Sequence, residues 1–179
     1  MEYPNLTEEG LLSFLGAEEI GAIVYRLAKE IRADYKTKNP ILIGVLKGAS
    51  LFLSDLVRAL RIPLEMDFIQ TSCYGKRDEP CSEVLILRDI TSDIKGRDII
   101  IVEDIIDRGH TARALIKYLG KKGPSSIKVC SLLVRDGNPH DLDVDYMGKS
   151  IGPGFVVGYG MDYKENYREL PGLYLMGPK

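Results

Sequence analysis

Apolar residues recur along this chain first at helical spacing and then at strand spacing, and the two patterns alternate. Between Glu18 and Asp34 they follow one another at three- and four-residue intervals, which predicts a helix with one apolar face. The same spacing predicts a second helix between Phe52 and Leu60 and a third from Thr111 to Lys122, ending at Gly123-Pro124. The first two apolar stripes consist of Ile20, Ile23, Val24, Leu27 and Ile31, and of Phe52, Leu53, Leu56, Val57 and Leu60.

Continuous apolar runs predict buried strands, because a strand that is covered on both faces has no polar side. Such runs occupy Ile41–Leu46, Asp98–Val102 and Ile127–Val134. Leu64–Thr71 alternates apolar with polar residues and predicts a half-exposed strand, and Glu83–Arg88 is a further strand candidate. Strands that alternate with helices are typical of an α/β fold with a mostly parallel central sheet flanked by helices.

Two segments are less regular. Cys73–Ser82 is polar and contains glycine and proline, so we expect a mobile loop there. Val144–Met176 predicts short strands separated by glycine and proline turns, with a turn of helix near Lys164–Arg168. No internal repeat or long linker divides the chain, and 179 residues suit a single domain, which we expect to span residues 1–179.

Composition narrows the class of protein. The chain is 45% hydrophobic and 28% charged, as soluble globular proteins are, and its formal net charge of −2 gives no general attraction to nucleic acid or to an anionic membrane. We expect no signal peptide, because residues 1–10 are polar and acidic, and no run reaches the roughly 18 apolar residues of a membrane span. Cys73, Cys81 and Cys130 lack metal-ligand spacing and fit a reducing compartment. We therefore expect a cytoplasmic protein that binds neither nucleic acid nor membrane.

The most informative segment is residues 99–111, IIIVEDIIDRGHT. A buried strand ends there in two acids, a tight turn follows, and a helix begins at Thr111. Ligands of open α/β sheets bind beyond the carboxyl ends of the strands, and the first N–H groups of a helix can hold a phosphate. Gly109 permits a close backbone approach or a positive φ, and Thr111 could cap the helix or donate to a phosphate oxygen. We therefore predict a phosphate site in this turn.

Glu103 and Asp104 stand beside that phosphate site although their charges repel a phosphate. Their presence is explained if they bind sugar hydroxyls or a hard cation such as Mg²⁺, which prefers oxygen ligands. The ligand would then be a phosphorylated sugar. The alternative is that both acids are merely solvated at a strand end. Neither GxxxxGK[ST] nor a helix-opening GxGxxG is present, so the familiar nucleotide motifs do not compete.

The segment VEDIIDRGHT resembles the phosphoribosyl pyrophosphate motif of the hypoxanthine-guanine phosphoribosyltransferases. Three further segments match that family in the same order: Val45–Gly48 (VLKG), Ser131–Val134 (SLLV), and Phe155–Tyr163 (FVVGYGMDY) with Tyr167-Arg168. The resemblance extends from about Leu11 to Leu175. It implies the type I phosphoribosyltransferase fold, with a small hood built from C-terminal and N-terminal segments. It also implies that a 6-oxopurine attacks the anomeric carbon of phosphoribosyl pyrophosphate and pyrophosphate leaves, with Mg²⁺ as cofactor.

The same resemblance implies a role for each matching residue. Asp107 would be the general base near the purine N7, and the Lys47–Gly48 peptide bond can be cis in relatives. Cys73 and Tyr74 would lie on a loop that closes over the site, and the family's assemblies imply a homodimer or homotetramer. The phosphoribosyl group would be bound by Glu103, Asp104, Asp107, Arg108, Gly109, His110 and Thr111, pyrophosphate by Lys47, Gly48 and Arg168, the purine by Arg135, Phe155, Val156 and Asp162, and Mg²⁺ by Glu103, Asp104 and Asp162.

Each role has a plainer alternative. Asp107 could be a turn aspartate that bonds its own backbone, and Phe155 could belong to the core. Lys47 could end a strand, and Asp162 and Arg168 could be surface charges.

Three positions depart from the family pattern. Arg108 stands in place of a threonine, and Cys73 in place of a serine. Arg135 replaces the lysine that donates to the purine O6 in relatives, and its forked guanidinium makes the exchange non-conservative. We expect a single contact to O6 or a changed base preference, unless Arg135 turns away from the pocket. A xanthine-preferring transferase and a non-catalytic sensor of phosphoribosyl pyrophosphate are the alternatives to a purine salvage enzyme.

Overall fold

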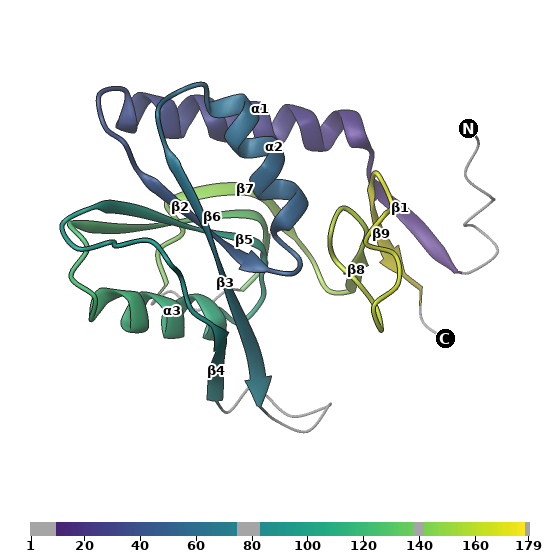
Figure 1. Cartoon of the computed structure of the whole chain (residues 1–179). Helices are drawn as coiled ribbons and strands as arrows, with labels where there is room; N and C mark the ends of the chain where they lie inside the picture. Colours follow the sequence, from purple (N-terminus) through teal and green to yellow (C-terminus); the bar gives the residue numbers. More distant parts are fainter. Residues whose placement is uncertain (1–9, 75–82, 138–141, 178–179) are drawn as a thin grey trace.

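The computed structural model describes residues 10–74, 83–137 and 142–177, and it has an α/β architecture (Figure 1). The central sheet has six strands in the order β4-β3-β2-β5-β6-β7, and only the β3–β4 pair is antiparallel. These strands are β2 (Ile41–Leu46), β3 (Glu65–Tyr74), β4 (Glu83–Arg88), β5 (Asp98–Ile106), β6 (Ser126–Arg135) and β7 (Tyr146–Ile151). The predicted mostly parallel sheet is therefore confirmed.

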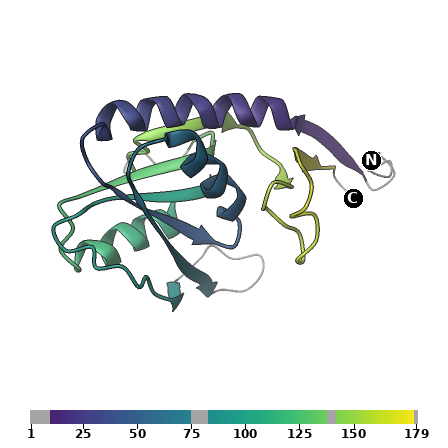
Figure 2. The same cartoon turned by 45° about the horizontal axis from the view of Figure 1, so that its top comes forward.

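Helices cover both faces of the sheet (Figures 1 and 2). One face packs on α1 (Ala17–Tyr35) and α2 (Ser50–Leu60), whose apolar stripes are buried against Leu42, Ile100 and Val102. The other face packs on α3 (His110–Gly120) through Ile99 and Ile101. Burial on both faces explains why β2 and β5 read as continuous apolar runs in the sequence.

A second, antiparallel sheet joins the two ends of the described chain. It consists of β1 (Leu11–Leu15), β8 (Phe155–Val157) and β9 (Leu173–Met176), in the order β1-β9-β8. Together with residues 158–172 it forms the expected hood, which lies beside the ends of the central strands (Figure 1). No helix within the described ranges is long and apolar enough to cross a membrane.

Several predictions of local structure need correction. Residues 164–168 form no helical turn, because Lys164, Glu165 and Tyr167 have positive φ and Tyr163 pairs with Asn166 as an isolated bridge. Strand β1 was not predicted, and β5 continues four residues beyond Val102, to Ile106. Cys73 and Tyr74 end strand β3 and pair with Val84 and Glu83 rather than lying in a loop, and residues 75–82 of that predicted loop fall outside the described ranges.

Candidate active site

A cavity of about 310 Å³ opens where the central strands meet the hood. Its walls come from the residues after β2, from the carboxyl ends of β5 and β6, and from β8 and the segment beyond it. All of its lining residues except Ile105 and Met161 were predicted as site residues. The lining is formed by Lys47, Gly48, Asp104, Ile105, Asp107, Arg135, Phe155, Val156, Met161, Asp162 and Arg168.

Three chain segments approach one another closely at the floor of the cavity. A Cβ atom on Gly48 would lie 1.9 Å from Asp104 Oδ2, and one on Gly160 would lie 2.3 Å from the Gly48 carbonyl oxygen. Gly160 also has a positive φ of 96°, which favours glycine. The cis peptide bond of this region joins Leu46 to Lys47, one bond before the expected position. The two glycines therefore allow the end of β2, the acids of β5 and the hood to meet.

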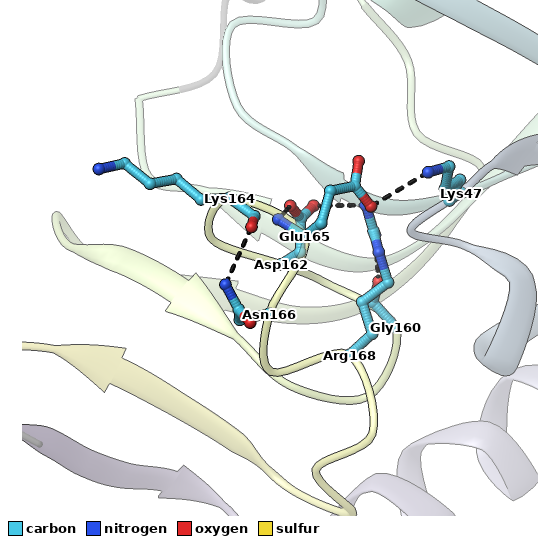
Figure 3. Close-up of polar contacts among 7 residues, drawn as sticks. All are labelled: Lys47, Gly160, Asp162, Lys164, Glu165, Asn166 and Arg168. Atoms are coloured by element: carbon cyan, nitrogen blue, oxygen red, sulfur yellow. Dashed lines mark hydrogen bonds and ion pairs between the residues drawn. The ribbon is translucent and has the colours of Figure 1, made fainter.

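A network of charged groups joins the hood to the end of β2 (Figure 3). The Arg168 guanidinium contacts Asp162 Oδ1 at 2.7 Å and Glu165 Oε2 at 3.3 Å, and it donates to the Gly160 carbonyl at 2.7 Å. Lys47 Nζ reaches the same Glu165 Oε2 at 3.0 Å. Nε of Arg168 is buried and has no acceptor in the described part of the chain. Sequence reasoning missed Glu165, because its partner Lys47 lies 118 positions away.

The two adjacent acids of β5 differ in environment. Neighbouring residues of a strand point to opposite faces, and Val102 faces α1 and α2, so Glu103 points toward the side of α3. It is buried, and it does not line the cavity. Burial, with the nearby charge of Asp104, raises the pKa of Glu103 well above its ordinary value. The expected contact of Glu103 with ribose or Mg²⁺ stays a prediction.

Asp104 lines the cavity, and burial disfavours the ionised form of its carboxyl group. Burial raises the pKa of Asp104 to about 6, although N–H groups of the backbone and the Arg168 charge oppose the rise. The Asp162 carboxylate adds to it. Asp104 and Asp162 line the same cavity and suit a hard cation, since Mg²⁺ binds one or two carboxylates and completes its shell with water and phosphate oxygens. The described residues include no group of three or more metal-ligating side chains.

Asp107 and Arg135, both in the cavity lining, form an ion pair. Arg135 Nε donates to Asp107 Oδ1 at 3.1 Å, with the Asp107 side chain 61% exposed and the Arg135 side chain 20% exposed. A second nitrogen of Arg135, Nη1, donates to the Gly152 carbonyl. Arg135 therefore does not turn away from the pocket.

The cavity lining also includes one aromatic ring, that of Phe155. Phe155 is 51% exposed, so it is not a core residue, and its ring meets Tyr163 edge to face at 5.7 Å between centroids. Val156 beside it is buried and contributes to the core. An exposed ring in a concave site provides a face on which a flat heterocycle can stack.

The predicted phosphate turn follows β5 directly. Gly109 is the N-cap of α3 and has a φ of 69°, so the helix begins at His110, one residue earlier than expected, and Thr111 is not the cap. Asp107 and Arg108 are exposed, and His110 and Thr111 are partly buried. The residues from Arg108 to Thr111 lie beside the cavity rather than in its lining. Their backbone N–H groups at the start of α3 remain suited to an anion.

Known proteins are similar to this chain in both sequence and architecture. Residues 13–164 match the family described as phosphoribosyl transferase domain. The chain is 40% identical over 165 residues to the hypoxanthine-guanine phosphoribosyltransferase of Bacillus subtilis, with 92% of each chain covered. It is 37% identical to the bifunctional protein TilS/HprT of Listeria innocua over 92% of this chain but only 26% of that protein, so it spans about a quarter of that relative's length. A hypoxanthine phosphoribosyltransferase structure from Staphylococcus aureus superimposes with a TM-score of 0.92 at 34% identity, covering 99% of this chain and 97% of that one.

Proposed function

Because this chain belongs to the phosphoribosyl transferase domain family, we propose that it is a purine salvage enzyme that transfers phosphoribose from phosphoribosyl pyrophosphate to a 6-oxopurine. Hypoxanthine and guanine are the proposed bases, and the products are the nucleoside monophosphate and pyrophosphate. The names of the relatives do not favour a xanthine-preferring transferase or a non-catalytic sensor.

The observation that carries the proposal is that one cavity is lined by two chemically different groups of residues. One group is the exposed ring of Phe155 with the Asp107–Arg135 pair, which suits a flat base that must lose a proton. The other group is Lys47 and Arg168, which suit a polyanion such as pyrophosphate. Asp104 lines the same cavity, and we assign it to the sugar.

We propose the following roles for the chain's own groups. Asp107 accepts the N7 proton of the purine as N9 attacks the anomeric carbon, and Arg135 donates to O6 through the nitrogen that it does not use for Asp107 or Gly152. Phe155 stacks on the base. The N–H groups from Arg108 to Thr111 hold the 5′-phosphate, and Asp104 accepts from the ribose hydroxyls.

Mg²⁺ is part of the proposal because the family uses phosphoribosyl pyrophosphate, and the residues present fit it in part. Asp104 and Asp162 would hold it with substrate oxygens, and it would neutralise the charge that develops on the leaving pyrophosphate. Glu103 was predicted as a further ligand; it is buried and does not line the cavity, and its role stays a prediction. A cytoplasmic location, a single domain over residues 1–179 and a homodimer or homotetramer complete the proposal.

The test is pyrophosphate release from phosphoribosyl pyrophosphate and Mg²⁺, with hypoxanthine, guanine, xanthine and adenine offered separately. We expect turnover with hypoxanthine and guanine and none with adenine. Binding of phosphoribosyl pyrophosphate without turnover of any base would instead indicate a sensor.

A further inference from the structure

Glu165 occupies an unusual position for an acidic residue in a site for polyanions. Its carboxylate oxygen Oε2 contacts Lys47 Nζ at 3.0 Å and Arg168 Nη2 at 3.3 Å. These are the two cations proposed for pyrophosphate, and they come from different segments, the end of β2 and the hood (Figure 3). One carboxylate therefore bridges the two cations.

The backbone at Glu165 is held by hydrogen bonds that do not involve the Glu165 side chain. The Glu165 N–H donates to Asp162 Oδ2 at 2.8 Å, and Tyr163 and Asn166 exchange two backbone hydrogen bonds of 3.1 Å around the turn. The Asn166 side chain closes the turn by donating to the Lys164 carbonyl at 2.9 Å. The Glu165 side chain is 66% exposed and can rotate toward solvent without loss of these contacts.

A carboxylate oxygen and a phosphoryl oxygen compete for the same donors. Both accept charge-assisted hydrogen bonds from ammonium and guanidinium groups, and a phosphoryl group forms them more strongly because it carries more charge. A pyrophosphate that binds Lys47 and Arg168 must therefore displace Glu165 or share both cations with it. Sharing would leave the Glu165 charge beside the charges of the ligand, which is unfavourable.

We propose that Glu165 is an internal competitor for the pyrophosphate subsite. Its carboxylate holds Lys47 and Arg168 in the empty enzyme, is displaced when pyrophosphate or the pyrophosphoryl end of the substrate binds, and returns as pyrophosphate leaves. It thereby lowers pyrophosphate affinity and speeds product release. The inference rests on the proposed function, because it assigns Lys47 and Arg168 to pyrophosphate.

The test compares Glu165→Gln with Glu169→Gln. Both substitutions remove one negative charge from the hood. Glu169 is exposed, and its carboxylate forms no ion pair with Lys47 or Arg168 in the described part of the chain. Binding of magnesium pyrophosphate is measured by titration calorimetry. We expect Glu165→Gln to bind on the order of 3- to 10-fold more tightly than the unaltered protein, as two exposed ion pairs allow, and Glu169→Gln to bind as the unaltered protein does. Pyrophosphate should inhibit turnover of Glu165→Gln at correspondingly lower concentrations.

Ionic strength provides a second readout. Exposed charges are screened by salt, so the advantage of Glu165→Gln should shrink when the titration is repeated in about 1 M salt. Equal affinity of Glu165→Gln and Glu169→Gln at low salt would overturn the inference. Weaker binding by Glu165→Gln would also overturn it, because Glu165 would then orient the cations for the ligand. If no protein binds pyrophosphate or releases it from phosphoribosyl pyrophosphate with a 6-oxopurine, the proposed function itself fails and the inference with it.

Discussion

Asp107 and Arg135 are the two paired residues of the cavity lining to which we assign the proton transfer and the O6 contact of the base. Asp107 is mostly exposed, so its carboxylate is accessible to a substrate. Arg135 uses Nε for Asp107 and Nη1 for the Gly152 carbonyl, which leaves Nη2 for another acceptor. The single contact to the purine O6 that we propose would use this remaining nitrogen.

The first prediction concerns Asp107→Asn. Asparagine keeps the size of the side chain but cannot accept a proton at neutral pH, so kcat should fall by about 100-fold or more. Binding of phosphoribosyl pyrophosphate, measured by calorimetry, should change little, because the backbone of the phosphate turn is unaltered. Turnover equal to that of the unaltered enzyme would remove Asp107 from the mechanism.

The second prediction concerns Arg135→Lys. A lysine at this position offers a compact charge without the second arm that now holds Gly152, so it loses one fixed contact and gains freedom to reach O6. We expect a several-fold change in the ratio of kcat/KM for hypoxanthine to that for guanine, measured with both bases under the same conditions. Lys149→Arg, the converse exchange at an exposed position of β7, provides the control. An unchanged ratio would place Arg135 outside base recognition.

At the scale of residues, most of the cavity lining could be predicted from the sequence, but the directions in which the side chains point could not. Lys47, Asp107 and Arg168 could be named from short motifs, and all three line one cavity. Glu103 could not be separated from Asp104, because the facing of a strand residue depends on which neighbours pack on each side. Glu165 could not be found either, because its contact with Lys47 joins segments that only the folded chain brings together.

At the scale of elements, the pattern of apolar residues predicted helices and strands correctly where it reflects their burial. Helix α1 and strand β2 were predicted within one residue of their observed ends, because their apolar patterns record burial directly. Strand β1 gave no clear pattern, since it is five residues long and its pairing with β9 involves the far end of the chain. The turn at residues 164–168 was misread as helical, because three positive φ values are not visible in a polar segment.

One hydrogen bond ties the hood to the helix layer. The Tyr159 hydroxyl donates to Asp55 Oδ2 on α2, and the Tyr159 ring is buried in the main core. Burial, with this bond to Asp55, raises the pKa of Tyr159, so the hydroxyl keeps its proton over the working pH range. The bond therefore persists as a link between two elements far apart in sequence.

The third prediction is that Tyr159→Phe lowers the free energy of unfolding by about 1–2 kcal/mol, because a hydrogen bond to a carboxylate is lost while the ring stays packed. The measurement is urea denaturation at neutral pH. Tyr25→Phe removes a hydroxyl from an exposed ring on α1 and should change the free energy by less than about 0.5 kcal/mol. Equal effects of the two substitutions would mean that the link to Asp55 contributes nothing to stability.

For the whole molecule, the acids at the carboxyl end of β5 oppose folding. Burial raises the pKa of Asp104 from 3.8 to about 6, so the folded chain binds a proton at Asp104 more readily than the unfolded chain does. Stability contributed by the neutral acid is therefore present at low pH and is lost as the pH rises through the folded pKa of about 6. Above that pH the folded protein carries a poorly solvated charge that a ligand with Mg²⁺ would compensate.

The fourth prediction follows from that penalty. Asp104→Asn removes the charge but keeps an oxygen that can accept from the backbone N–H groups now bonded to Asp104, so it should stabilise the ligand-free protein by about 1–3 kcal/mol at about pH 8. The gain should decline as the pH falls from about 6 toward about 4, because Asp104 itself becomes neutral there. Urea denaturation at several pH values measures it, and Asp143→Asn, at an exposed carboxylate, is the control. The same variant should lose binding of phosphoribosyl pyrophosphate, because the charge that destabilises the empty fold is the one proposed for the ligand. A gain that does not vary with pH would show that folding does not raise the pKa of Asp104.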